Sequence, residues 1–379
     1  MNSDKPLDRL ILVAGAGPVG MTAALELARR GHTVRIVDKE EGPAPLSQSR
    51  ALAVNARTLT LLEPSGASAH IVDSAQHILE MRVRSRDRLL AAVDLRSAGT
   101  KRYTGIHGLA QGRTERILMD RLKALGVEVE WKTEAVLIGS DPSRPEVELN
   151  VAEGAREVVK ADILIAAEGA HSPIRKKLGI GFPGDSVPAG FYLADFRYKS
   201  ELDTSYGEAV FFNPGVFARL PVASDTLRYI STMENFLDLI DHPAPIAEMP
   251  WQTEFHVSFR HVDPMSKGKV FLVGDAAHIH SPVGGRGMNL GIEDACWLAW
   301  LIDEGREEEF SALRVATATT VLKQTHQLTS MILLKNPLAI SARNLLLPMA
   351  TRVPFVRNGL LKAIGGGDTP APPWLVSST

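Results

Sequence analysis

The sequence has little of what disulfide-stabilised, membrane-spanning or nucleic-acid-binding proteins use. Cys296 is the only cysteine, so neither an internal disulfide nor a thiolate zinc site can form, and we expect a reducing cytoplasm. No apolar run reaches the roughly 18 residues of a membrane-spanning helix. The apolar run Leu10–Ala14 is too short for a signal peptide. Lys and Arg total 42 against 44 Asp and Glu, a formal net charge of -2, which argues against nucleic acid as a partner.

The chain has the composition of a globular protein, and it is longer than the chains that usually fold around a single hydrophobic core. Its 379 residues are 45% hydrophobic and 23% charged. A chain of this length predicts two packed lobes.

A β-α-β unit is predicted at the start of the chain. Leu10–Ala14 is a continuous apolar strand, Met21–Arg30 a helix ended by Gly31, and Thr33–Val37 a second strand. Further along, the predicted buried strands are Ala161–Ala167 and Lys269–Val273, and a helix covers Met288–Ile302.

Segments of another character lie between these parallel units. Alternating patterns predict half-buried, mostly antiparallel strands at Met81–Arg86, Leu89–Leu95, Tyr192–Tyr198, Ala209–Phe212 and Leu227–Met233. Because parallel units occur at the start, middle and end of the chain, we expect an α/β fold of two interleaved domains.

The first glycine-rich loop has the spacing of a dinucleotide-binding motif. Gly15-Ala16-Gly17-Pro18-Val19-Gly20 is G-x-G-x-x-G between a strand and a helix. Gly15 permits the turn, Gly17 admits a pyrophosphate, and Gly20 lets the helix approach the strand. Asp38, at the end of the second strand, can accept hydrogen bonds from a ribose. The motif predicts a dinucleotide without separating FAD from NAD.

Two later strands also end in acidic residues beside glycine. Glu168 precedes Gly169, and Asp275 follows Gly274. Ligands of open α/β sheets bind beyond the carboxyl ends of the strands, so Gly15, Glu168 and Asp275 should share one edge. Pro282 to Asn289 then opens a long helix, whose free N–H groups suit developing negative charge.

Four stretches resemble motifs of the flavoprotein aromatic hydroxylases (class A monooxygenases), a family that includes p-hydroxybenzoate, phenol and polyketide hydroxylases. They are GDAAHIHSPVGGRGMNLGIEDACWLAW (274–300), Ser49–Thr58, Gln111–Leu118 and 167–175, in the family's order. The resemblance spans residues 10 to about 302 and is specific for the family rather than for a substrate.

The resemblance implies a Rossmann-like FAD-binding domain of the glutathione-reductase type, interleaved with a mostly antiparallel substrate domain. The implied boundaries are 1–75, 101–182 and 267–305 for the FAD-binding domain, 76–100 and 183–266 for the substrate domain, and 306–379 for a C-terminal helical segment with a flexible tail.

The activity implied is that of a monooxygenase using FAD, NADH or NADPH, and molecular oxygen. In the family a flavin C4a-hydroperoxide transfers oxygen to an aromatic or polyketide-like molecule, so we expect neither a protein nucleophile nor a metal. No catalytic base can be singled out. The alternatives are a halogenase, epoxidase or reductase on the same fold, or a non-catalytic binding protein; the Trp-x-Trp-x-Ile-Pro motif of tryptophan halogenases does not occur.

By position, the resemblance places Asp275 on the ribityl chain, Arg50 and Gln111 beside it, and Pro282 on the substrate side of the flavin. The predicted cofactor site comprises Gly15, Gly17, Pro18, Val19, Gly20, Asp38, Lys39, Arg50, Gln111, Glu168, Gly169, Gly274, Asp275, Pro282, Gly285, Gly287, Met288 and Asn289.

The chain departs from the family at several positions. Glu168 stands where Asp is usual, and Arg286 replaces a common Gln. Phe310 and Arg314 are interpreted as remnants of a Tyr-x-x-x-Arg-x-Pro stretch.

Substrate-pocket candidates come from the inserted strands, since pockets are mostly apolar with a few polar groups. They are Tyr192, Phe211, Phe212, Phe217, Arg219 and Tyr229, for each of which core packing is the alternative.

The end of the chain is rich in Leu, Met and Arg from Val321 to Ile364. We expect these residues to pack over the FAD domain, with a membrane surface or a homodimer contact as alternatives. Gly365–Pro373 has the composition of an extended, mobile end.

Overall fold

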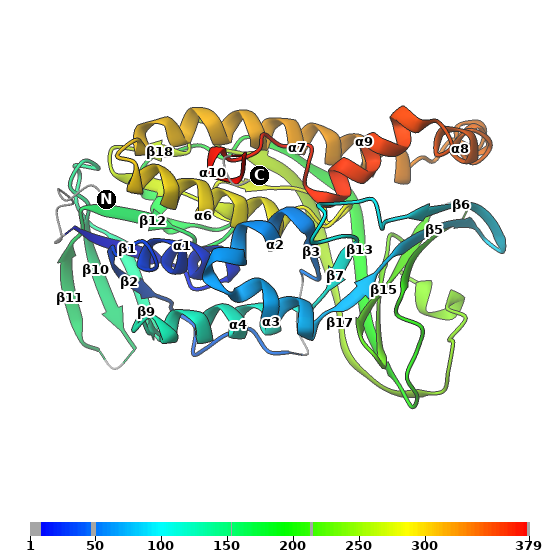
Figure 1. Cartoon of the computed structure of the whole chain (residues 1–379), viewed down its shortest axis with the longest axis horizontal. Coiled ribbons are helices and arrows are strands. Elements are labelled where there is room, and N and C mark those ends of the chain that lie inside the picture. Colours follow the sequence, from blue (N-terminus) through cyan, green and yellow to red (C-terminus); the bar gives the residue numbers. More distant parts are fainter. Residues whose placement is uncertain (1–8, 47–50, 153, 213–214, 377–379) are drawn as a thin grey trace.

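Two large sheets lie side by side in the fold, with long helices along one side of both (Figure 1). The computed structural model describes residues 9–46, 51–152, 154–212 and 215–376. The α/β fold with an inserted, mostly antiparallel sheet is as the sequence predicted.

Within the described residues, the parallel sheet has the strand order β18-β19-β12-β1-β2-β8. β1 pairs in parallel with β2 and β12, and only the short edge strand β18 runs antiparallel among these described strands. The strands are β1 (Leu10–Ala14), β2 (Thr33–Val37), β8 (Val129–Glu130), β12 (Ile163–Ala166), β18 (Ser266–Lys267) and β19 (Val270–Leu272). The bounds of β1 and β2 are those predicted.

Three helices cover one face of this sheet, with α1 (Pro18–Ala28) between α4 (Gln111–Ala124) and α6 (Gly287–Asp303). α1 begins earlier than predicted because extended Gly17 precedes Pro18, whose fixed φ suits a first helical turn. Buried residues of β1, α1, β12 and α6 form one continuous core.

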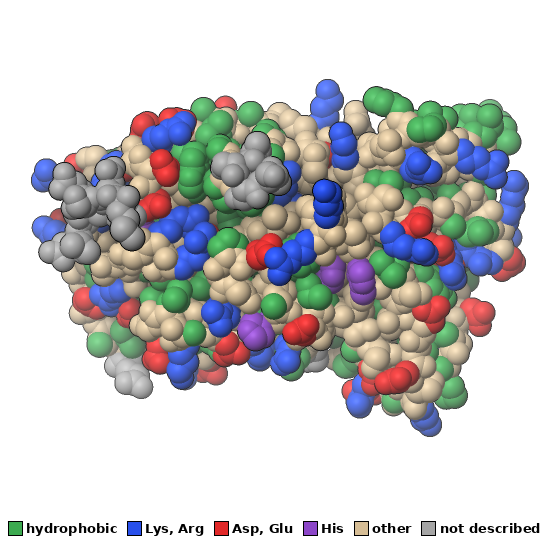
Figure 2. Space-filling model, viewed as in Figure 1, with side chains coloured by type: hydrophobic (Ala, Val, Ile, Leu, Met, Phe, Trp, Pro, Cys, Tyr) green, Lys and Arg blue, Asp and Glu red, His purple; other side chains and the backbone are tan. Residues whose placement is uncertain are grey.

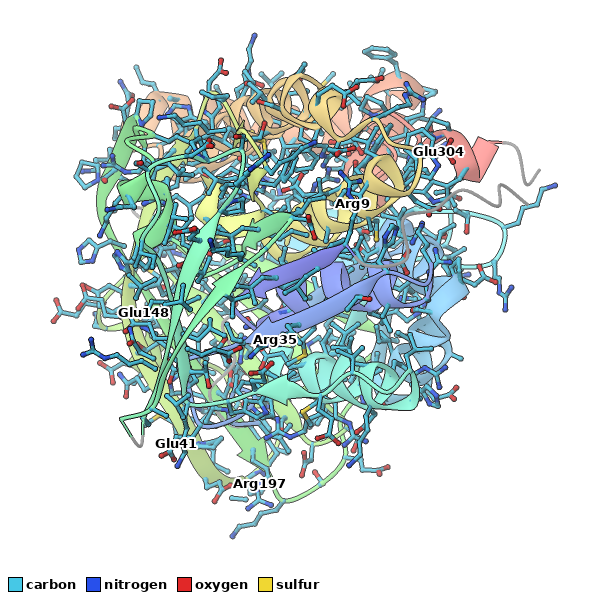
Figure 3. The ribbon with its side chains drawn as sticks, turned by 90° about the vertical axis from the view of Figure 1, so that its left-hand side faces the viewer. Arg9, Arg35, Glu41, Glu148, Arg197 and Glu304 are labelled. Carbon is cyan, nitrogen blue, oxygen red and sulfur yellow. The ribbon has the colours of Figure 1, made fainter. Side chains whose placement is uncertain are left out.

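A three-stranded sheet that the sequence reading missed completes this half of the molecule. It consists of β9 (Thr133–Leu137), β10 (Glu146–Val151) and β11 (Arg156–Lys160), whose inward residues join the same core. Arg35 on β2, which is labelled in Figure 3, pairs with Glu130 on β8 and Glu157 on β11, both at 2.8 Å.

The second large sheet has, among the described residues, the order β20-β17-β13-β16-β15-β14-β5-β6. β14 pairs in parallel with β5, and the other described pairs are antiparallel. The strands are β5 (Glu80–Ser85), β6 (Arg88–Asp94), β13 (Gly184–Tyr198), β14 (Tyr206–Phe211), β15 (Val216–Ala223), β16 (Thr226–Ser231), β17 (Ile246–His261) and β20 (His278–Ile279).

Short elements complete the fold. They are the strands β3 (Ala53–Asn55), β4 (Gln76–Ile78) and β7 (Ile106–Gly108), the helices α2 (Ala56–Leu62), α3 (Ala67–Ser74) and α5 (Pro173–Lys177), and the 3-10 turns η1 (Glu63–Ser65), η2 (Phe236–Leu239), η3 (Gly274–Ala276) and η4 (Glu307–Glu309).

The C-terminal helices are α7 (Phe310–Ile332), α8 (Pro337–Ala350), α9 (Pro354–Gly365) and α10 (Pro373–Val376). The stretch after α9 differs from the mobile tail expected: Thr369 is buried and donates to Glu293, and Asp368 lies 2.7 Å from Arg286. Trp374 packs against both Trp297 and Trp300 of α6. Within the described residues, no helix combines the length and the apolar character of a membrane span.

Candidate cofactor site

The loop between β1 and α1 is shaped by close backbone contacts at two of its glycines. Gly15 has φ +101°, and a Cβ there would overlap the carbonyl oxygen of Ala167; a Cβ at Gly20 would overlap that of Gly15. At Gly17, by contrast, no described atom lies within 4 Å of a Cβ position. No described side chain caps α1, so its N-terminal amides face the open space at Gly17.

Asp38 fixes this loop to the end of β2. Its Oδ2 accepts a hydrogen bond from the Ala16 amide at 2.5 Å and its Oδ1 one from Glu40 at 2.9 Å. Lys39 beside it is exposed. The carboxylate therefore lies at the Gly15–Gly20 loop, and its role as a ribose acceptor stays a prediction.

Val19 has a packing role. A Cβ at Gly274 or at Gly291 would contact the Val19 side chain, so these two glycines let η3 and α6 approach α1 closely. The two helix N-termini of the predicted site are thereby held side by side.

The N-terminus of α4 holds the chain that follows β2. Gln111 accepts from the Ala51 amide at 3.3 Å and donates to Glu115 at 2.8 Å. Glu115 accepts from the Ala44 amide at 2.6 Å, and Arg116 donates to the Ala44 carbonyl at 2.8 Å. The sequence analysis assigned Glu115 no role. In the structure, burial raises the pKa of its carboxyl. Arg50 lies outside the described residues.

The segment after β12 connects the first loop to the third. Glu168 accepts from the Ser172 hydroxyl, and burial raises the pKa of its carboxyl to about 7. Gly169 has φ +83°, which a glycine adopts without strain. Arg175, nearly fully buried, donates to the carbonyls of Ala170 at 2.8 Å and Ala276 at 3.0 Å. The Glu168 and Asp275 motifs are thus directly joined.

Asp275 is exposed between buried Gly274 and Ala276, and Pro282 is exposed as well. Gly284 and Gly285 follow with φ +85° and +62°, bending the chain into α6. Around Gly287, no described atom would contact a Cβ, while Met288 is half-buried.

The Asn289 side chain is fully engaged within the protein. Its Nδ2 donates to the Ala53 and Gly285 carbonyls at 2.8 and 2.6 Å, and its Oδ1 accepts from Asn55 and Thr58 at 3.0 and 2.7 Å. Asn289 therefore connects β3 and α2 to the start of α6. Because its side chain is used in this way, only its backbone is available to bind a ligand.

A buried ionic network lies beneath this loop. His278 Nε2 is 2.5 Å from Asp294, and Arg314 reaches Asp294 at 2.7 Å and Glu293 at 2.8 Å. Burial opposes the charge, yet His278 and Arg314 hold the pKa of Asp294 below its ordinary value. Arg314 was noted only as a motif remnant. Asp294 was missed, because a separation of 20 residues between two helices carries no local signal.

The eight-stranded sheet has two distinct faces. Leu220 packs with Ile78, Ile106 and Leu361, so its face is turned toward the cofactor half and α9; we call it the inner face. The opposite, outer face carries its own core under η2, in which Phe217, Tyr229 and Phe236 are buried.

Most substrate-pocket candidates belong to the outer face. Tyr192 and Phe212 pack against the outer core, Arg219 donates to Tyr206, and the Tyr229 hydroxyl is 3.1 Å from Tyr198. Phe211 differs from these residues, because the guanidinium of Arg343 on α8 lies over its ring, 3.6 Å from the ring centre.

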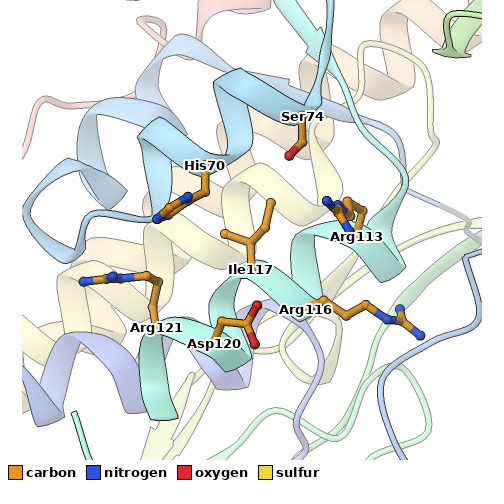
Figure 4. A pocket seen from close by; sticks show the side chains of 7 residues that line it. All are labelled: His70, Ser74, Arg113, Arg116, Ile117, Asp120 and Arg121. Atoms are coloured by element: carbon orange, nitrogen blue, oxygen red, sulfur yellow. The ribbon is translucent and has the colours of Figure 1, made fainter. Parts of the chain in front are cut away.

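Two surface hollows contain none of the predicted residues. One of about 210 Å³ lies between α3 and α4 and is lined by three arginines, His70 and Asp120 (Figure 4). The other, about 450 Å³, is lined by His77 and His107, which stack at 4.7 Å. In the described part of the chain, no three His, Cys, Asp or Glu side chains are grouped to hold a metal ion.

The sheet order and the glycine-rich loop Gly15–Gly20 define an α/β protein that binds a dinucleotide. The chain belongs to the FAD-binding domain family, whose model matches residues 9–233 and 224–320. FAD is therefore the dinucleotide of this fold.

The chain is similar to known hydroxylases. It is 32% identical over 358 residues to 6-methylpretetramide 4-monooxygenase of Streptomyces rimosus, covering 87% of this chain and 63% of that protein, less than two thirds of its length. The structure of OxyS anhydrotetracycline hydroxylase from Streptomyces rimosus matches with TM-score 0.77 and 27% identity, over 96% of this chain and 76% of that one. p-Nitrophenol 4-monooxygenase PnpA from Pseudomonas putida DLL-E4 shares the fold (TM-score 0.83, 21% identity, 94% of this chain and 99% of that one).

Proposed function

We propose that the protein is an FAD-dependent monooxygenase that hydroxylates an aromatic or polyketide-like small molecule with NADH or NADPH and molecular oxygen. The observation that carries the proposal is the convergence of three separated segments at one edge of the parallel sheet. Gly15 touches Ala167, and Arg175 bonds to Ala276, so the loops at residues 15, 168 and 275 meet.

The residues of this edge suit FAD. The uncapped N-terminus of α1 and the open space at Gly17 would take the pyrophosphate, and Asp38 the adenosine ribose. Exposed Asp275 would accept from the ribityl chain, with Gln111 beside it. Backbone amides from Gly284 to Asn289 would donate toward the flavin pyrimidine, and Pro282 would flank the ring. Bound FAD supplies the redox and oxygen-transfer chemistry, while the chain binds, orients and excludes water.

For the substrate, we propose the space between the inner face and the start of α6. Phe211 is the one predicted pocket residue on that face; Phe217 and Tyr229 are proposed to be structural. The named substrates of similar proteins, such as anhydrotetracycline and p-nitrophenol, are aromatic. An aromatic compound fits an apolar face of this kind.

The test is a screen of phenolic and polycyclic polyketide compounds for stimulated NADH or NADPH consumption by the purified protein. Hydroxylated product and hydrogen peroxide are then measured together. Consumption coupled to product supports the proposal; peroxide alone with every compound, or a preparation that releases no FAD on denaturation, contradicts it.

A further inference from the structure

The far end of the molecule exposes a group of large apolar side chains on α8 and the first turns of α9. The exposed fractions are 81% for Leu338, 68% for Leu345, 61% for Met349 and 87% for Phe355. Leu338, Leu345 and Met349 are spaced 7 and 4 residues apart, which places them on one helix face. Ile340 and Arg343 on the opposite face are buried. We call this group the apolar corner; it lies at the upper right of Figures 1 and 2.

The segment that forms the apolar corner contains no acidic residue. From Phe310 to Gly367 the sequence contains no Asp or Glu, although the whole chain has 44. The same stretch contains seven Lys and Arg residues. Lys335, Arg352, Arg357 and Lys362 are exposed beside the apolar residues.

Charge decides which partner fits. A second copy of the chain would bring the same four cations against their equivalents, which disfavours symmetric self-association. An anionic lipid surface matches both features of the apolar corner. Its hydrocarbon can accept the Leu, Met and Phe side chains, and its negative headgroups can pair with Lys and Arg. We propose that α8 and the start of α9 bind the surface of an anionic lipid bilayer, lying in its plane.

The apolar corner is fixed to the eight-stranded sheet. Arg343 stacks on Phe211 at 3.6 Å, and Asn344 donates to Ser85 at 3.2 Å. β6 packs against α8 and adds Leu89, which is 52% exposed. α8, the helix that would meet lipid, therefore also covers part of the inner face. An apolar compound dissolved in the lipid would reach the protein beside the inner face.

The experiment is vesicle co-sedimentation of the whole protein. Vesicles of phosphatidylcholine alone are compared with equal parts phosphatidylcholine and phosphatidylglycerol, at low salt and at about 0.5 M salt, where charge attraction is screened. The variants are Leu345→Gln with Phe355→Gln, and Arg352→Glu with Arg357→Glu. Val158→Gln is the matched control, because Val158 is 56% exposed on β11 at the opposite end of the molecule.

We expect the wild type and Val158→Gln to bind the anionic vesicles at low salt and to be released at high salt. Both double variants should bind at least about tenfold more weakly with unchanged melting temperatures. The proposal is overturned if anionic and neutral vesicles bind alike, if the double variants bind as wild type, or if they instead abolish a concentration-dependent dimer. Vesicle binding is measured without substrate or NAD(P)H, so it is independent of the proposed enzymatic function.

Discussion

Two glycines of one loop differ in what a single methyl group would meet. A Cβ at Gly20 overlaps the Gly15 carbonyl, whereas at Gly17 it enters open space. Glycine at position 20 therefore serves the fold, and glycine at position 17 serves the ligand we propose.

We predict that Gly20→Ala destabilises the protein by about 3 kcal/mol or more, because packed backbone must move. Gly17→Ala should cost less than about 1 kcal/mol at this N-cap yet weaken FAD binding more than about tenfold. Denaturant unfolding and fluorescence titration of apoprotein with FAD measure the two effects. Equal FAD affinity for Gly17→Ala and wild type would remove Gly17 from the site.

Glu168 is the departure from the family with the clearest electrostatic signature. Burial raises the pKa of its carboxyl from 4.5 to about 7. Between these values the unfolded chain has lost the proton and the folded chain has kept it. Stability from this group is therefore greatest below the lower value and declines as pH rises through 7.

We predict that Glu168→Gln removes this decline. From pH 5 to pH 8 the wild type should lose up to about 3 kcal/mol relative to the variant, the equivalent of the pKa difference. The free energy of unfolding at several pH values measures it. Parallel pH profiles for the two proteins would contradict the buried position of this carboxyl.

Among the elements, α6 and α7 are joined by charge inside the core. Arg314 of α7 neutralises Asp294 and Glu293 of α6, and all three side chains are nearly fully buried. Replacing one partner leaves uncompensated charge in a low-dielectric interior.

We predict that Arg314→Met lowers the free energy of unfolding by about 3–5 kcal/mol. Lys160→Met is the control, since the Lys160–Glu146 pair is exposed and should contribute little. Chemical denaturation of both variants gives the comparison, and similar small losses in the two would show that the buried network is dispensable.

Elements were predictable where the pattern was local. The apolar run that ends at Gly15 predicted the observed bounds of β1, and the run between Gly31 and Asp38 predicted those of β2. β17 escaped notice, because exposed polar residues and Pro250 interrupt its pattern over a strand of 16 residues. The two faces of the eight-stranded sheet could not be told apart, since both carry apolar residues and only tertiary contacts with η2 or α9 distinguish them.

The motifs of the candidate site were predictable from the sequence, whereas the buried contacts that hold these motifs in place were not. Asp38 and Asp275 follow strands at recognisable positions. Glu115, Asp294 and the Arg286–Asp368 pair depend on segments that meet only in space. The composition of residues 365–373 predicted a mobile end. It could not predict that Thr369, and Trp374 just after this stretch, pack on α6.

At the scale of the whole molecule, a dinucleotide at this edge would connect three distant stretches of chain. A ligand that binds only the folded state stabilises it in proportion to the logarithm of its excess over Kd. FMN contains the flavin and ribityl parts but lacks the adenosine half that Asp38 would hold.

We predict that FAD at about 100 times its Kd stabilises the apoprotein by roughly 2.7 kcal/mol, and that FMN at the same concentration stabilises it far less. Asp275→Ala should reduce the FAD effect while leaving the melting temperature of the apoprotein unchanged. Differential scanning calorimetry measures all three. Equal stabilisation by FMN would place the ligand away from the β1–α1–β2 unit.

The strand order of the parallel sheet also bears on how the protein is made. β1 lies between β2 and β12, and β19 is the further neighbour of β12. When the nascent chain has left the ribosome up to residue 40, β1 can pair with β2, but the edge that pairs with β12 is open and β12 is still more than 120 residues away. Such an unpaired edge of an apolar strand attracts unwanted pairing. The nascent protein should therefore need chaperone protection until the middle of the chain emerges, and early truncations should aggregate.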